Sequence, residues 1–332
     1  MGRVRIHFRA TYQPGVYISE KGDKMLVKLN TQKLPTTTTI GIFIAMLTIR
    51  CQTVDDHHVL LENQKWIHGS EDCSTNAHSL IQVVRYNEDT WILRQNKCVH
   101  YEAPFMFLFI GDNKALLVDT GATGDENNFP LYRIVNTILT DWQTLHKNTV
   151  QLIVAHTHGH RDHIEGDAQF RGKADIEVVG VDVESIKKYF SIQHWPEDNS
   201  SIELGGRLVE ILPIPGHQRA SISFYDHSSR LFLTGDTFYP GRLYVEDWAA
   251  FKQSIDKLLE FAEHHEISYI LGNHIEMSSS PGIDYPTGST FQPEEHRLPL
   301  TIYDLQSLKL ALDQLGNSPT RAVHDSFIIS PK

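Results

Sequence analysis

A buried strand that runs straight into a histidine-rich loop constrains this chain more than any other sequence feature. Residues 150–155 read Val-Gln-Leu-Ile-Val-Ala, and an apolar run of this length is typical of a strand covered on both faces. Four histidines and an aspartate follow within eight positions: His156, His158, His160, Asp162 and His163. Protonated imidazoles repel one another, whereas neutral imidazole and carboxylate groups bind metals. The pattern therefore predicts a metal-binding loop at the tip of a buried strand.

Strand-like and helix-like segments alternate from about residue 80 onward. Two pairs of β-rich runs are separated by turn signals and predict hairpins: 79–86 with 90–95, and 105–111 with 115–121. Apolar residues at helical spacing predict four helices: 131–147, 182–190, 248–265 and 302–316. Two halves of similar make-up predict an α/β fold of the αββα sandwich type, with two packed mixed β-sheets and helices on both outer faces.

The first 50 residues have a different character. Two lysines after Met25 precede an apolar run at residues 40–49, which is the order of charges and apolar residues in a secretory signal peptide. Arg50 follows the run directly and no small-residue cleavage site is evident, so a buried strand or short helix is the alternative. We expect residues 1–50 to be a leader or a disordered N-terminus, residues 51–79 an N-terminal extension and residues 80–332 one folded domain. The corresponding location is periplasmic or secreted, and otherwise cytoplasmic.

The three cysteines bear on the same question. Removal of a leader with Cys51 would leave Cys73 and Cys98 as an even pair, and a bridge between them would fit an oxidising compartment. Spacing alone does not determine bonding, so two free thiols are the alternative.

The charge of the chain indicates which partners to expect. The net charge is −11, which divides into +6 for residues 1–50 and −17 for the remainder. Binding to nucleic acid depends on lysine and arginine, so an acidic body argues against it. No apolar run is long enough for a membrane-spanning helix. We expect a small-molecule substrate.

Three further metal-ligand candidates stand at the ends of other predicted strands: His217, Asp236 and His274. Each alone carries little weight, because an aspartate after a strand is commonly a turn residue. With four donors from the histidine loop they make seven, a number that fits two metals sharing a carboxylate. Imidazole and carboxylate ligands suit two Zn²⁺ ions, and also Fe or Mn. The alternative is a solvated histidine-rich loop.

The His-x-His-x-Asp-His motif at residues 158–163, followed by these distant residues, resembles the signature of the metallo-β-lactamase superfamily. The resemblance extends from about residue 80 to 315. It implies two ligand sets with a residue shared between them: His158, His160 and His217 for the first metal; Asp162, His163 and His274 for the second; and Asp236, with a hydroxide, as the bridge. His156 and Arg161 lie outside this pattern, and His156 is expected to pack at the strand end.

The resemblance also narrows the expected chemistry. Antibiotic-cleaving members usually have Cys or Ser where this chain has Asp236. An aspartate at this position instead resembles the glyoxalase II, lactonase and phosphodiesterase branches. The segment at residues 235–242 is similar to a motif of hydroxyacylglutathione hydrolases; it reads Gly-Asp-Thr-Phe-Tyr-Pro-Gly-Arg. The segment after His217 departs from their pattern at Gln218, Arg219 and Ala220, which weighs against glutathione thioesters.

These features predict a dinuclear zinc hydrolase in which a metal-bridging hydroxide cleaves an ester, thioester or lactone. Asp162 is the expected proton shuttle. Tyr239 stands where lactonases have a tyrosine that holds the substrate carbonyl, so it is a candidate catalytic oxyanion donor; a packed aromatic residue is the alternative. Asp119 is expected to brace the metal loop rather than to react. The loop after His274 is expected to shape substrate access, with rim candidates Glu276, Tyr285 and His296.

Other readings of the same ligand set remain. A β-lactam hydrolase or a phosphodiesterase would use the same fold. An iron-dependent oxidoreductase would use the same ligands, although no flavodoxin-like domain follows the predicted domain. A non-catalytic binding module would retain the fold, but the intact set of seven ligands argues against it.

Overall fold

The computed structural model describes residues 16–20, 25–29 and 60–332. The chain divides into two compact units, residues 1–54 and residues 55–332. In the first unit, β1 (Val16–Glu20) and β2 (Met25–Leu29) form an antiparallel pair in which Glu20 is opposite Met25. The apolar run at residues 40–49, on which the expected signal peptide depends, lies outside the described residues. Among the described residues, no helix has the length and apolar character needed to cross a membrane.

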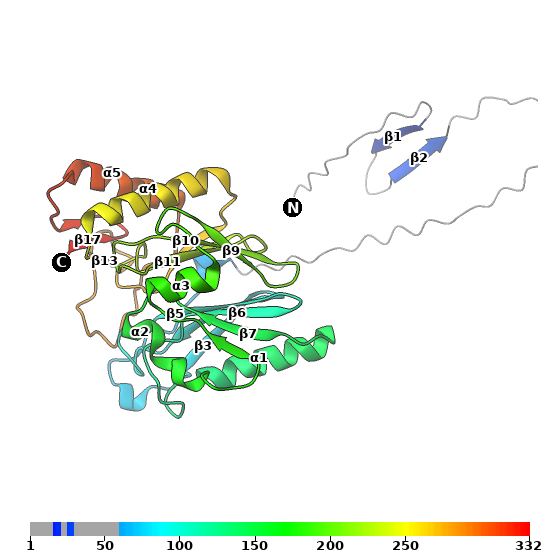
Figure 1. Cartoon of the computed structure of the whole chain (residues 1–332), viewed down its shortest axis with the longest axis horizontal. Helices are drawn as coiled ribbons and strands as arrows, with labels where there is room; N and C mark the ends of the chain where they lie inside the picture. Colours follow the sequence, from blue (N-terminus) through cyan, green and yellow to red (C-terminus); the bar gives the residue numbers. More distant parts are fainter. Residues whose placement is uncertain (1–15, 21–24, 30–59) are drawn as a thin grey trace, which may run out of the picture. The chain divides into compact units, whose positions relative to one another are not determined.

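The second unit is built on two six-stranded mixed sheets (Figure 1). The N-terminal sheet has its strands in chain order: β3 (Ile81–Asn87), β4 (Thr90–Gln95), β5 (Phe105–Ile110), β6 (Lys114–Val118), β7 (Gln151–Ala155) and β8 (Ile176–Val178). Its pairing is antiparallel from β3 to β6 and parallel from β6 to β8. Both predicted hairpins, β3–β4 and β5–β6, are therefore present.

The C-terminal sheet has the order β15-β14-β12-β11-β10-β9. Its strands are β9 (Ser200–Glu203), β10 (Leu208–Pro213), β11 (Ile222–Asp226), β12 (Leu231–Gly235), β14 (Tyr269–Gly272) and β15 (Pro299–Leu300). Only β12 and β14 pair in parallel; the other neighbours are antiparallel.

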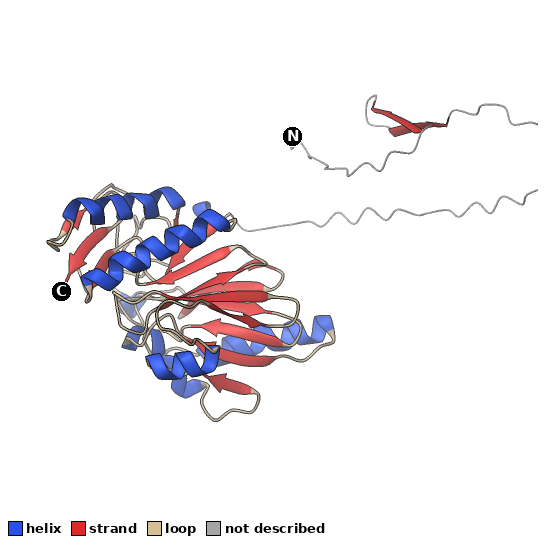
Figure 2. Ribbon diagram, turned by 45° about the horizontal axis from the view of Figure 1, so that its top comes forward, coloured by secondary structure: helices blue, strands red, loops and turns tan. Residues whose placement is uncertain are grey.

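Helices cover the outer face of each sheet (Figure 2). These covering helices are α1 (Leu131–His146), α4 (Trp248–His264) and α5 (Ile302–Leu315). The shorter α3 (Val183–Phe190) instead packs Ile186 and Phe190 into the cluster between the two sheets, and α2 (Arg161–Ile164) belongs to the histidine loop. Apolar residues of α1 pack on the N-terminal sheet, and those of α4 and α5 pack on the C-terminal sheet. The predicted αββα sandwich, and the four long helices at the expected positions, are confirmed.

The alternation of side chains along β5 explains the layers. Phe105, Phe107 and Phe109 face the cluster between the two sheets, whereas Met106 and Leu108 belong to the cluster under α1. Successive side chains of a strand point to opposite faces, so a strand covered on both sides is apolar throughout. This is why the sequence of β5 shows a continuous apolar run rather than an alternating one.

A third sheet was not anticipated from the sequence. It consists of β13 (Arg242–Val245), β16 (Ala322–Val323) and β17 (Ile328–Pro331), with β17 in the middle. These strands are two to four residues long, which is too short to show a period-two pattern. The same reason accounts for the missed β9 and β15.

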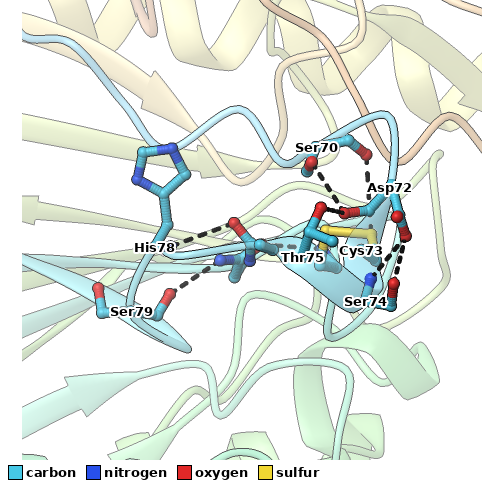
Figure 3. Close-up of a disulfide and its surroundings, with 10 residues drawn as sticks. Ser70, Asp72, Cys73, Ser74, Thr75, His78 and Ser79 are labelled. Atoms are coloured by element: carbon cyan, nitrogen blue, oxygen red, sulfur yellow. Dashed lines mark hydrogen bonds between the residues drawn. A yellow bond between two sulfur atoms is a disulfide. The ribbon is translucent and has the colours of Figure 1, made fainter.

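Within the second unit, residues 60–80 are attached to the sandwich by apolar packing and by a disulfide (Figure 3). Three short 3₁₀ helices occur in the unit: η1 (Leu61–Asn63), η2 (Cys73–Thr75) and η3 (Glu165–Gln169). Leu61 and Trp66 are buried in the central cluster. Cys73 on η2 is bonded to Cys98, which follows β4. Of the two alternatives for these cysteines, the disulfide is therefore the correct one.

Candidate metal centre

Five strands from both sheets end at the same edge of the sandwich, and each of these ends carries part of the site. In the N-terminal sheet, Asp119 follows β6 and the histidine loop follows β7. In the C-terminal sheet, β10 leads to His217, β12 to Asp236 and β14 to His274. Because β10, β12 and β14 run in the same direction, their carboxyl ends meet at one edge. Such an edge is the usual place for a ligand site in an open α/β sheet.

Two glycines allow the backbone to approach closely beside the ligands. Gly216 has φ of +138°, and a Cβ there would lie 2.4 Å from the Cα of Phe251 in α4. Gly235 has φ of +56°, and a Cβ there would lie 2.8 Å from the Cβ of Thr157. A side chain at either position would push a ligand strand away from its neighbour, and the positive φ itself favours glycine.

The first donor cluster consists of three histidine rings. The facing nitrogens of His158 (Nε2) and His160 (Nδ1) are 3.0 Å apart, and Nε2 of His217 lies 3.2 and 3.1 Å from them. Two nitrogens bound to one tetrahedral zinc are separated by about 3.3 Å, given a Zn–N bond of about 2.05 Å. The three nitrogens are therefore spaced as ligands of one zinc would be.

The second donor cluster contains Asp162, His163, Asp236 and His274, whose candidate ligand atoms all lie within 4.8 Å of one another. Oδ2 of Asp162 is 3.1 Å from Nε2 of His163 and 3.2 Å from Nε2 of His274. The structure thus brings together all seven ligand candidates from the sequence, in the two groups that the resemblance implies.

Asp236 lies between the two clusters. Its Oδ1 faces His274 at 3.4 Å, and its Oδ2 faces His217 of the first cluster at 3.8 Å. Oδ1 is buried and accepts no hydrogen bond from the described residues. A buried carboxylate oxygen without a donor is costly unless a cation compensates it. This oxygen therefore fits a bound metal.

The two clusters differ in their electrostatics. Burial and the neighbouring imidazoles lower the pKa of His158 well below its usual range and that of His217 to about 4. Both rings are therefore neutral and offer lone pairs at neutral pH. Burial acts in the same direction on His274, but Asp236 and Asp162 outweigh it and raise its pKa to about 9. The second cluster consequently attracts positive charge, as metal binding requires.

Other ring nitrogens of the ligand histidines are held by oxygen atoms, which fixes the orientation of each ring. Nδ1 of His217 faces the carbonyl of Tyr244 at 2.8 Å, and Nδ1 of His274 faces that of Glu102 at 3.0 Å. Metal-binding histidines are commonly oriented by such contacts.

Asp119 joins the parts of the site beneath the ligands. Its carboxylate is fully buried, lies 3.0 Å from Nδ1 of His163, and accepts bonds from the backbone and hydroxyl of Thr157 at 2.8 Å each. Asn273 donates to it at 2.6 Å. Burial raises the pKa of Asp119, but His163 and His156 outweigh it and lower the pKa to about 2. Asp119 was predicted from the sequence, whereas Thr157 and Asn273 were not, although both adjoin ligands in the sequence.

The two residues outside the motif, His156 and Arg161, belong to neither donor cluster. His156 is buried with Nε2 3.1 Å from Oδ1 of Asp167. Arg161 has an 88 % exposed side chain that pairs with Glu165.

Tyr239 is close to His274, with a ring separation of 5.7 Å, but its hydroxyl is directed elsewhere. The hydroxyl donates to the carbonyl of Arg242 at 2.6 Å and lies 3.0 Å from Oε2 of Glu276. Burial and Glu276 raise the pKa of Tyr239 well above its usual range. The hydroxyl is therefore engaged in holding the loop after His274, an arrangement closer to the packed alternative than to an oxyanion donor.

The three rim candidates differ in their roles. Glu276 pairs with Arg242 at 2.6 Å and accepts from the backbone nitrogen of Arg242 at 2.7 Å. The hydroxyl of Tyr285 accepts from the backbone of Glu294, and His296 contacts the carbonyl of Arg297. All three stabilise the long loop, and none belongs to either donor cluster.

Part of the chain that carries this site is similar to a known protein family. Residues 102–265 match the model of the metallo-beta-lactamase superfamily. The matched segment contains Asp119 and six of the seven ligand candidates, and His274 lies beyond it.

Individual relatives match over shorter or more divergent stretches. The hydroxyacylglutathione hydrolases of Brucella anthropi and Brucella ovis are 29% identical over 106 residues, which are 31% of this chain. That stretch spans only 40% and 41% of the lengths of these relatives. A metallo-beta-lactamase structure from Pontibacter korlensis is 16% identical with a TM-score of 0.46, covering 70% of this chain and 99% of that chain. A metallo-beta-lactamase structure from Hirschia baltica is also 16% identical, with a TM-score of 0.44. It covers 59% of this chain and 91% of that chain.

From the family match over residues 102–265, the chain contains a metallo-β-lactamase superfamily domain.

Proposed function

We propose that this chain is a dinuclear zinc hydrolase that cleaves an ester, thioester or lactone bond. The observation that carries the proposal is the grouping of seven donors into two clusters, with the buried carboxylate of Asp236 between them. Two bound zinc ions would supply Lewis-acid activation of a water molecule and of the substrate oxygen. Fe and Mn suit the same donors, so the choice of zinc is part of the proposal.

Asp162 is the residue we assign to proton transfer. It is the most exposed member of the second cluster, with a side chain that is 15% exposed against 9% for Asp236. Burial raises the pKa of Asp162, but His163 and His274 outweigh it and hold the pKa below its usual range. Asp162 is therefore ionised and is the member of the cluster that solvent reaches best, so it can accept a proton from the attacking water. Tyr239 contributes by holding the loop through Arg242 and Glu276.

The substrate class rests on two features. Asp236 replaces the Cys or Ser of antibiotic-cleaving members, and the relatives that match are named hydroxyacylglutathione hydrolases. The departures at Gln218, Arg219 and Ala220 favour esters and lactones over glutathione thioesters.

A substrate panel on the zinc-loaded protein tests the proposal: lactones, thioesters, phosphodiesters and a chromogenic β-lactam. We expect turnover with an ester, thioester or lactone, and a loss of at least about a hundredfold in His158→Ala/His160→Ala. Arg161→Ala is the matched control from the same loop and should retain turnover, because its side chain is 88% exposed. Full turnover in the double variant would refute the site, and native iron with a redox-active spectrum would refute zinc.

We also propose that the chain works in an oxidising compartment, periplasmic or extracellular. The Cys73–Cys98 disulfide supports this, because such bonds are rare in reducing cytosol. The lysines and apolar run before residue 50 support it as well. Fusion of residues 25–60 to an alkaline phosphatase that is active only after export provides the test. An inactive fusion that remains in the cytoplasm would contradict the proposal.

A further inference from the structure

A third group of side chains that could bind a metal lies away from the candidate metal centre. The edge of the sandwich that carries that centre is called the catalytic edge below. Glu210 of β10, His227 after β11 and His265 at the end of α4 have their candidate ligand atoms within 4.8 Å of one another. α4 begins beside Gly216, whose carbonyl accepts from the backbone of Asp247. The helix has 17 residues, so the two ends are separated by about 25 Å. The group is therefore distinct from the candidate metal centre.

Distances within the group suit coordination. Oε1 of Glu210 lies 2.6 Å from Nε2 of His227 and 3.3 Å from Nε2 of His265. The three side chains are 22%, 37% and 24% exposed, so an ion can reach them from solvent. Two imidazole nitrogens and one carboxylate oxygen are a common ligand set for zinc, with water completing the coordination.

The hydrogen bonding of His265 shows which of its nitrogens is available. Nδ1 lies 2.8 Å from the carbonyl of Phe261, and a carbonyl only accepts, so Nδ1 carries the proton in the neutral ring. Nε2 then presents a lone pair toward the carboxylate of Glu210. Two lone pairs facing each other are unfavourable unless a cation, either a metal ion or a second proton, lies between them. A backbone carbonyl that orients a histidine in this way is typical of metal ligands.

The surroundings hold the two histidines in place and favour positive charge. The ring of Tyr225 lies 4.9 Å from that of His227 and 5.1 Å from that of His265. Tyr225 is fixed in turn, because its hydroxyl donates to the carbonyl of Glu266. Since His265 is the C-cap residue of α4, the group also lies at the negative end of the helix dipole.

We propose that Glu210, His227 and His265 bind a structural Zn²⁺ ion that fastens the C-terminal end of α4 to strands β10 and β11. The ion joins segments that are otherwise linked at this point by side-chain contacts such as that of Tyr225 with Glu266. This site is independent of the proposed hydrolase activity.

Zinc content and stability of the full chain test the site. After saturation with Zn²⁺ and gel filtration, we expect His227→Ala/His265→Ala to retain one zinc equivalent fewer than the wild type, whatever the loading of the catalytic edge. The melting temperature in zinc should also rise less in this variant. His264→Asn, an exposed histidine one position away, is the matched control and should retain the full zinc content.

Glu210→Gln keeps the size of the side chain and removes its charge, so it provides the same test if the double variant fails to fold. Equal zinc content in wild type and both variants would overturn the proposal, as would loss of the extra equivalent in His264→Asn. Binding only at millimolar zinc would also overturn it, because it would indicate an ordinary surface ion pair. Failure of the hydrolase panel leaves this comparison unaffected, so the two proposals are tested separately.

Discussion

At the scale of single residues, the site depends on buried polar groups whose partners come from distant parts of the chain. Asp119 holds Thr157, His163 and Asn273 in one network. Because the carboxylate is completely buried, removal of its charge leaves donors without an acceptor, which costs more than an ordinary surface change. The positions of the ligands are therefore determined partly by a residue that touches no substrate.

Asp119→Asn should weaken zinc binding at the catalytic edge by about ten- to a hundredfold, because it removes the acceptor that orients His163. Zinc affinity measured by competition with a chelator checks this. Asp125→Asn, at an aspartate whose contacts are local, is the control. Unchanged affinity in Asp119→Asn would show that the network does not support the ligands.

Lys97 is a buried lysine: its side chain is 2% exposed, and its Nζ lies 3.9 Å from Oε1 of Glu295. Burial, together with Arg94, lowers the pKa of Lys97 to about 7. In the unfolded chain its pKa is about 10.4, so the unfolded state binds more protons between these values. Stability should therefore rise with pH from about 7 to about 10.4 and level off above it.

Replacement of this lysine removes the group that titrates. Lys97→Met should show a smaller gain in the free energy of unfolding over that pH range than the wild type, as measured by urea denaturation at several pH values. Lys188→Met, at an exposed lysine of α3, should keep the wild-type slope. Identical slopes in Lys97→Met and wild type would refute the assignment.

At the scale of elements, the short helix η2 and the segment around it depend on a covalent link. Asp72 caps η2 by accepting from the backbone of Ser74 at 2.9 Å, and three residues cannot form a stable helix alone. The disulfide joins this segment to Cys98, 25 residues further along. The attachment of residues 60–80 to the sandwich therefore combines the bridge with the burial of Leu61 and Trp66.

Cys73→Ser/Cys98→Ser should lose about 3.5 kcal/mol of unfolding free energy, the value expected from closing a loop of this length. Denaturant titration of wild type and variant, both without reductant, measures the difference. Addition of reductant should lower the stability of the wild type and leave the variant unchanged. A variant as stable as the oxidised wild type would contradict the prediction.

At the scale of the whole molecule, the two sheets are joined by the hydrogen bonds of a buried arginine as well as by apolar packing. Arg207, before β10, binds Asp226 through two nitrogens at 2.8 and 2.7 Å. It also donates to the carbonyl of Asp89 in the β3–β4 turn and to that of Ile110 at the end of β5, both in the N-terminal half of the sandwich. The side chain of Asp226 is completely buried, so Arg207 supplies the positive charge that compensates this carboxylate. The same arginine is a hydrogen-bond donor to the other half of the sandwich.

Arg207→Met should therefore destabilise the protein by about 3 to 5 kcal/mol, because it leaves Asp226 buried without its cation. Arg207→Met/Asp226→Asn should recover part of that loss, since the unpaired charge is gone. Arg230→Met is the control, because Arg230 forms an exposed pair with Glu266. A loss below about 1 kcal/mol in the first variant would place this pair among ordinary surface salt bridges.

Much of this architecture could be predicted from local sequence, and the failures share a cause. The long strands and helices were predicted because their apolar periodicity spans enough residues to be recognised. β13, β16 and β17 were missed because strands of two to four residues carry no such signal. The group of Glu210, His227 and His265 was missed as well, because its members are far apart in sequence and belong to no motif.

The sequence by itself determined which side chains are available and that successive side chains of a strand occupy opposite faces. The alternation in β5 and the donor types after β7 follow from residue order alone, because backbone geometry sets side-chain direction. Only the tertiary structure decided that Asp236 lies between two donor clusters, that the hydroxyl of Tyr239 is directed at Arg242 and Glu276, and that Cys73 bonds to Cys98. Each of these depends on how close two distant segments come when the sheets pack, and no local pattern encodes that distance.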